Sequence, residues 1–212
     1  INGADFTENE SLYVQSGTYN SAVGGGAVSV KSGKLTVTAS SFDRNKSGYY
    51  GGAVHTSKTD VIIDGETEFS ANEGGTGGAI YFSGSDVTLK NISFTDNVSG
   101  LNGVIYASGT LNAENITATG NKAVSGGVLY VSGTSTVAEI KGSSFSGNNA
   151  SNGGVAYAKE ATLNINNCQI SENSAKLGGA LYTEKGIFNI KASVFDKNTA
   201  SSNGGAIDLV AG

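Results

Sequence analysis

The chain has 212 residues, a formal net charge of −5, and no proline, methionine or tryptophan. Arg44 is its single arginine, which excludes the arginine-rich basic stripe typical of nucleic-acid-binding proteins. No apolar run reaches the length of a membrane-spanning helix, and the single cysteine, Cys168, cannot form a disulfide within the chain.

A glycine-rich tetrapeptide that leads into an apolar segment recurs every 24 to 27 residues. Its copies occupy residues 25–28, 51–54, 77–80, 102–105, 126–129, 153–156, 178–181 and 204–207. A fixed period of this length is typical of repeat architectures, so we expect a fold built from stacked coils. Residues 1–19 lack the tetrapeptide and are expected to form an irregular or degenerate first coil, and residues 204–212 an incomplete last coil.

Between these copies runs a second motif, most often Phe-x-x-Asn, which predicts two columns of stacked side chains. The phenylalanines are Phe42, Phe69, Phe94, Phe145 and Phe195. The asparagines are Asn20, Asn45, Asn72, Asn97, Asn121, Asn148, Asn173 and Asn198. Ala118 and Ile170 occupy the phenylalanine position in two coils. When coils stack, rings can pack on one another and each amide can donate to the next, so we expect both columns to be structural.

The segments between the motifs are short, apolar and alternate with a period of two, as in residues 35–37, 61–63, 87–89 and 163–165. This pattern is typical of β-strands, and nowhere does a ten-residue stretch show helical periodicity. Three short strands in each repeat predict an all-β fold, a right-handed parallel β-helix of about eight coils. We expect residues 1–212 to form a single β-helix segment of a longer protein. A leucine-rich-repeat horseshoe has a similar period, but its core pattern is missing.

Five tyrosines directly follow the apolar residue of the glycine motif: Tyr81, Tyr106, Tyr130, Tyr157 and Tyr182. If Ile80, Ile105, Leu129 and Leu181 point inward, strand alternation places these tyrosines outside the coil. Two interpretations remain open. The tyrosines could form an interaction strip for a protein or a glycan, or neighbouring rings could cover one another and stiffen the sheet.

The alternation of Gly-Gly-Ala-[Ile/Leu/Val] with Phe-x-x-Asn, as in residues 51–54 with Phe69 and Asn72, resembles the repeats of the polymorphic membrane protein family. That family comprises autotransporter adhesins, and similar repeats occur in other adhesin-like surface proteins. The resemblance extends from about Asn20 to Ile207. It implies a β-helical passenger at the cell surface that binds host or neighbouring cells. The fourth coil departs from the pattern, with Asn102 in the glycine motif and Ala118 in the phenylalanine position.

Residues that could carry catalysis or bind a metal form no recognisable site in the sequence. His55 is the only histidine and has no second histidine or cysteine close in sequence, which predicts neither a zinc site nor a catalytic triad. The densest carboxylate group is Asp60, Asp64, Glu66, Glu68 and Glu73. We interpret it as a solvated or weakly cation-binding edge, with paired catalytic carboxylates as the alternative. We therefore expect no enzymatic activity, no cofactor and no metal.

The expected function is that of a non-catalytic adhesin segment, whose partner is a protein or glycan on a host or neighbouring cell. One alternative is a structural subunit that assembles end to end, through its first and last coils, into extracellular filaments or a surface layer. The other is a carbohydrate-binding or glycan-active β-helix. We expect a location at the cell surface, no nucleic-acid partner, and no membrane span in this segment.

Overall fold

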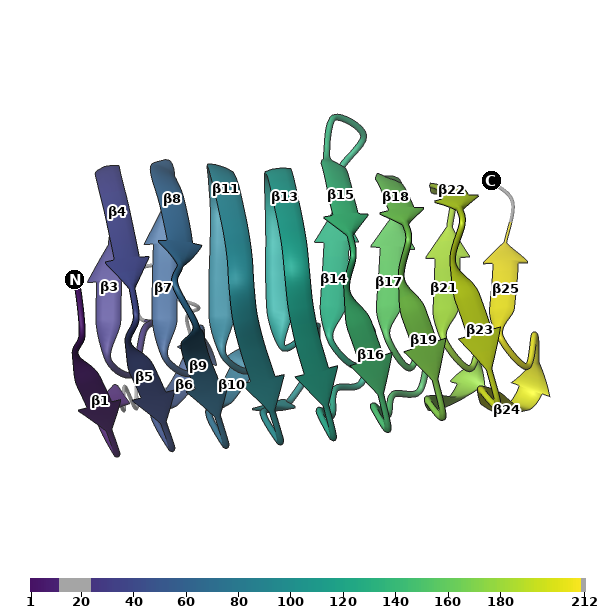
Figure 1. Cartoon of the computed structure of the whole chain (residues 1–212), viewed down its shortest axis with the longest axis horizontal. Helices are drawn as coiled ribbons and strands as arrows, with labels where there is room; N and C mark the ends of the chain where they lie inside the picture. The colour runs from purple at the N-terminus through teal and green to yellow at the C-terminus, as the bar shows by residue number, and fades with distance from the viewer. Residues whose placement is uncertain (12–23, 211–212) are drawn as a thin grey trace, which may run out of the picture.

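The computed structural model of the protein describes residues 1–11 and 24–210, which form a parallel β-solenoid of about seven turns. The described residues contain strands, turns and bends but no helix, so the predicted all-β fold is confirmed. Successive coils follow one another along the long axis, from the N-terminus to the C-terminus (Figure 1). The turn count falls slightly below the expected eight, and the last coil is described only through its first strand, β25 (Ile207–Val210).

Each complete coil contains strand segments that recur in a fixed order. The first segments are β3 (Val28–Val30), β7 (Val54–Ser57), β14 (Leu129–Ser132), β17 (Ala156–Lys159), β21 (Leu181–Glu184) and β25. The second are β4 (Gly33–Thr38), β8 (Thr59–Asp64), β15 (Val137–Lys141), β18 (Thr162–Asn166) and β22 (Ile187–Lys191). The third are β1 (Asp5–Thr7), β5 (Ser41–Asp43), β9 (Thr67–Ser70), β16 (Ser144–Ser146), β19 (Gln169–Ser171) and β23 (Val194–Asp196).

The structure differs in two ways from the expected three short strands in each coil. In two coils the three segments merge into the long strands β11 (Ile80–Thr95) and β13 (Ile105–Thr119). These strands still turn corners, and β11 does so at Gly84 and Asn91, whose φ angles are 59° and 54°. A short fourth segment also recurs, as β2 (Glu10–Ser11), β6 (Lys46–Tyr50), β10 (Glu73–Thr76), β12 (Val98–Ser99), β20 (Ser174–Leu177) and β24 (Thr199–Asn203).

Equivalent residues of successive coils lie in register. Val61 pairs with Val87, and Ile80 pairs with both Val54 and Ile105. The glycine motif permits this close stacking. Gly51 has a φ of 60°, and a Cβ on Gly52 would clash with the carbonyl oxygen of Gly78 in the next coil.

The phenylalanine column is present as expected. The rings of Phe42 and Phe69 stack with centroids 4.7 Å apart, and those of Phe69 and Phe94 with centroids 5.1 Å apart. Phe6 extends the column, 4.8 Å from Phe42, although the sequence analysis did not include it. Residues 1–11 thus belong to the stack, because β1 and β2 pair with β5 and β6.

The asparagine column forms a continuous ladder of hydrogen bonds in the core. The main-chain N–H and the Nδ2 of Asn45 both donate to Oδ1 of Asn72, at 2.9 and 3.0 Å. Asn72 repeats this pair of bonds toward Asn97, and its Nδ2 also donates to the carbonyl of Phe42 in the preceding coil. The same pattern continues through Asn121, Asn148 and Asn173 to Asn198. Buried amides with this many partners stabilise the stack.

The position before Asn45 in the ladder belongs to Asn9. Its main-chain N–H and Nδ2 donate to Oδ1 of Asn45, at 3.0 and 2.9 Å. Asn20, which the sequence analysis placed in the column, lies outside the described residues. The motif Phe6-Thr7-Glu8-Asn9 is therefore a copy of Phe-x-x-Asn that the sequence analysis missed.

The ladder predicts a large loss of stability when one amide is removed. The change Asn97→Ala leaves two buried donors of Asn72 without an acceptor, and we expect the free energy of unfolding to fall by about 3 kcal/mol or more. Urea denaturation of the variant measures this. Asn112→Ala, at an exposed position of β13, serves as the control and should change stability by less than about 0.5 kcal/mol. An equal effect of both changes would contradict a structural role for the ladder.

A second prediction concerns Thr56, which is fully buried in β7. Among the described residues, its Oγ1 is the buried side-chain polar atom that has no hydrogen-bond partner. Valine occupies the equivalent position at Val30 and Val131. We expect Thr56→Val to raise the free energy of unfolding by about 1 kcal/mol, because it removes an unsatisfied hydroxyl without changing shape. Thr59→Val should lower it, because Thr59 Oγ1 donates to the carbonyl of Ser57 at 3.0 Å.

Candidate functional site

The tyrosine column lies outside the coil, as strand alternation predicts, and Ile80, Ile105, Leu129 and Leu181 point into the core. Its rings contact one another in sequence along the rod. The centroid distances are 4.6 Å for Tyr81 and Tyr106, 5.6 Å for Tyr106 and Tyr130, 5.0 Å for Tyr130 and Tyr157, and 4.9 Å for Tyr157 and Tyr182.

This column forms a second hydrophobic cluster rather than an open strip. Tyr130, Tyr157 and Tyr182 are only 8%, 7% and 9% exposed, and Leu177 packs against them. The hydroxyl of Tyr157 donates to Glu184 at 2.6 Å, and burial with that carboxylate raises the pKa of Tyr157. Burial also raises the pKa of Tyr81 to about 12. The low exposure favours the interpretation that the rings stiffen the sheet; partner binding through them stays a prediction.

His55 occupies the same column, next to Tyr81. It is 3% exposed, its Nδ1 lies 3.2 Å from the Ser29 hydroxyl, and the ring of Tyr50 packs against it at 5.9 Å. Burial, with a smaller contribution from the charge of Lys31, lowers the pKa of His55. The neutral imidazole thus acts as one more stacked ring of the column.

The carboxylates that are close in sequence separate in the structure. Asp64 accepts hydrogen bonds from the main-chain N–H of Gly65 at 2.6 Å and from Asn91 Nδ2 at 2.9 Å. Glu73 forms an ion pair with Lys46 at 2.9 Å, in the sheet of fourth segments. Asp60, Glu66 and Glu68 are exposed. Among the described residues, no group of three or more His, Cys, Asp or Glu could hold a metal ion.

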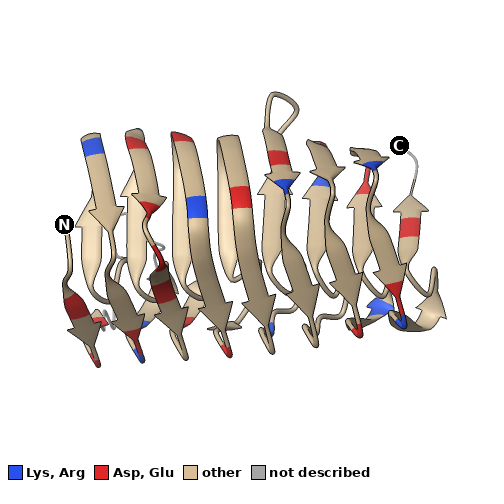
Figure 2. Cartoon of the chain, in the orientation of Figure 1, with Lys and Arg blue, Asp and Glu red and all other residues tan. Residues whose placement is uncertain are grey.

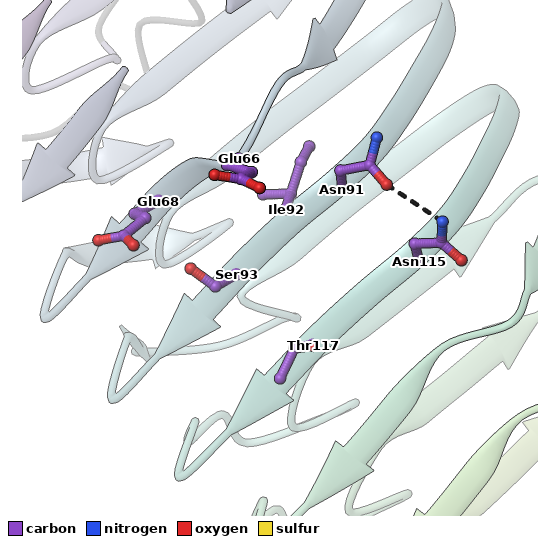
Figure 3. A pocket seen from close by; sticks show the side chains of 7 residues that line it. All are labelled: Glu66, Glu68, Asn91, Ile92, Ser93, Asn115 and Thr117. Atoms are coloured by element: carbon purple, nitrogen blue, oxygen red, sulfur yellow. Dashed lines mark hydrogen bonds between the residues drawn. The ribbon is translucent and has the colours of Figure 1, made fainter. Parts of the chain in front are cut away.

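The outer face of the second and third segments carries shallow hollows. One of them, here called the amide groove, has a volume of about 370 Å³. It is lined by Glu66, Glu68, Asn91, Ile92, Ser93, Asn115 and Thr117. Figure 3 shows Asn91 and Asn115 side by side on β11 and β13, where Asn115 Nδ2 donates to Asn91 Oδ1 at 3.1 Å.

This groove was not predicted from the sequence, although a signal was present. Asn-Ile-Ser at 91–93 recurs as Asn-Ile-Thr at 115–117. In both copies the isoleucine is buried and the two polar residues point outward. The stretches 91–95 and 115–119 carry no charged residue, and Figure 2 shows the corresponding ends of β11 and β13 without charge. The groove is therefore an amide and hydroxyl surface with two carboxylates at one side.

The burial of His55 predicts that the stability of the fold decreases as the pH is lowered. Because the folded-state pKa is lower than the unfolded value of about 6.5, protonation favours the unfolded chain. The stabilisation that neutral His55 provides is complete above the unfolded-state pKa and is lost as the pH falls below it. The total loss is about 1.4 kcal/mol for each unit by which the folded and unfolded pKa values differ. Denaturation between pH 5 and 7 measures it. His55→Tyr, the residue of the neighbouring coil, should flatten the profile; an unchanged slope would rule out His55 as the cause.

The comparisons with known proteins address the fold. Residues 25–203 match the family model described as a right handed beta helix region. No curated protein and no solved structure matches the chain. Among the described residues, no helix is long and apolar enough to cross a membrane. The family match covers most of the chain and agrees with the parallel stacking of its coils, so the protein belongs to the right-handed β-helix family.

Proposed function

We propose that this chain is a non-catalytic segment of a cell-surface adhesin, a stiff rod that presents a repeated outer face to a partner on a host or neighbouring cell. The observation that supports the proposal is the unbroken register of the coils. The asparagine ladder runs from Asn9 to Asn198 without a gap, so outward positions recur at one-coil intervals along the whole rod.

The choice of face follows from burial. Three of the five tyrosines are almost fully covered, which leaves little aromatic surface for a partner. The third segments instead expose Thr95, Thr117, Thr119, Ser144 and Gln169 on consecutive coils. A surface of exposed hydroxyl and amide groups suits weak contacts that are repeated along the rod, since linked weak sites gain avidity without new contacts. End-to-end assembly through the first and last coils stays a prediction.

The proposal predicts that beads coated with the folded chain adhere to cells. We expect retention on an epithelial or bacterial cell layer under flow to exceed that of albumin-coated beads several-fold. Beads coated with the Asn97→Ala variant should lose adhesion at urea concentrations that unfold the variant but not the parent chain. Retention equal to that of albumin on every cell type would refute the adhesin assignment. Release of reducing ends from a polysaccharide panel would instead indicate an enzyme.

A further inference from the structure

We propose that the amide groove is a binding site for a neutral oligosaccharide. This inference rests on the proposed function, because it names the chemistry of the partner that the rod contacts. The groove brings together the outward side chains of two adjacent coils with two carboxylates from the preceding coil (Figure 3).

Several polar atoms in the groove are available to a ligand. Asn91 and Asn115 satisfy part of their capacity through their mutual bond, and Asn91 Nδ2 also bonds Asp64. Asn115 retains its Oδ1 and one Nδ2 hydrogen. Within the described part of the chain, the hydroxyls of Ser93 and Thr117 and the carboxylates of Glu66 and Glu68 have no hydrogen-bond or ion-pair partner. The groove therefore offers donors and acceptors at fixed positions on paired strands.

These atoms match the chemistry of sugar hydroxyls. Each sugar hydroxyl can donate one hydrogen bond and accept two, which suits amide and hydroxyl neighbours that do both. Ionised Glu66 and Glu68 can accept from hydroxyl donors, and such charge-assisted bonds are stronger than neutral ones. The hollow has a volume of about 370 Å³ and is shallow, so a bound oligosaccharide would lie along the surface with one side facing solvent.

The lining also excludes other classes of ligand. No lysine or arginine lines the groove, so Glu66 and Glu68 would repel an acidic glycan or a phosphate. Ile92 is 3% exposed and the groove contains no aromatic ring, so an apolar ligand would gain little by binding there. A neutral polyhydroxyl ligand remains the best match to this combination of charge and polarity.

Side-chain amide signals in NMR spectra test the proposal directly. Cellohexaose, xylohexaose, mannohexaose and chitohexaose are titrated separately into the whole chain, with hexagalacturonate as the acidic comparison. We expect at least one neutral oligosaccharide to shift the Asn91 and Asn115 amide signals in a saturable way, and hexagalacturonate to leave them unchanged. No shift with any neutral oligosaccharide, or an equal response to hexagalacturonate, would overturn the proposal.

A matched set of variants separates the groove from the fold. Gly142 occupies the same turn position as Asn115 with a φ of 56°, so Asn91→Gly combined with Asn115→Gly preserves a backbone conformation that the chain already uses. We expect this pair to weaken binding about tenfold or more, the equivalent of 1.4 kcal/mol. Asn167→Gly is the control, because Asn167 has the same turn conformation on another coil and does not line the groove. Undiminished binding by the double variant would overturn the proposal.

The bead assay distinguishes failure here from failure of the proposed function. If the parent chain adheres to cells but binds no neutral oligosaccharide, the adhesin assignment stands and the assignment of the groove is wrong. If the chain binds an oligosaccharide through Asn91 and Asn115 but beads do not adhere, the groove assignment stands and the adhesin assignment is wrong.

Discussion

Each asparagine from Asn45 to Asn173 donates two hydrogen bonds to the carboxamide oxygen of the next coil, and the stacking of the whole rod depends on this interaction. Both bonds require the two residues to lie directly above one another, so the ladder sets the registration of the coils. Coils of different length therefore accommodate their additional residues in the turns and loops between the strands. Asn45 and Asn72 are separated by 27 residues, and the additional residue is accommodated at Gly65 in the turn between β8 and β9. The interval from Asn121 to Asn148 is also 27 residues, and here a loop projects between β14 and β15 (Figure 1).

The fourth coil shows how the core tolerates an interruption of the phenylalanine column. Ala118 replaces phenylalanine, and Ala107 and Ala113 are also small, yet all three positions are buried. In the preceding coil Phe82 pairs with Ala107, so a large side chain stands beside a small one. Asn97 still donates to Asn121 at 3.1 Å, and the ladder is continuous through this coil. Alternating large and small side chains thus fill the interior without displacing the amides.

Much of this architecture could be predicted from the sequence, because the strongest signals come from positions at which the fold accepts only one type of residue. A glycine with positive φ, a buried amide and a stacked ring each tolerate few substitutes, so Gly51, Asn72 and Phe69 recur visibly. Phe6 and Asn9 were not predicted as members of the two columns. They precede the first glycine motif, and without that motif their coil was expected to be irregular or degenerate.

The exposure of the tyrosines and the position of the groove depend on which residues of other coils pack beside them. The alternation of apolar and polar residues in the sequence does not give this information. Alternation gives the direction of Tyr130 but not the Leu177 that packs beside it. In the same way, it places Asn91 and Asn115 outside without showing that Glu66, from the preceding coil, lies in the same hollow. Because the ladders fix every inward position, variation from coil to coil is concentrated on the outer face. The outward charges Lys90, Glu114 and Lys141 alternate in sign along one column, and Lys90 and Glu114 pair at 3.4 Å. Such charges neutralise one another across the coils, whereas the amides and hydroxyls beside them retain unused hydrogen-bonding capacity. Selection for binding would therefore act on these outward polar positions, where a change of residue leaves the stacking intact.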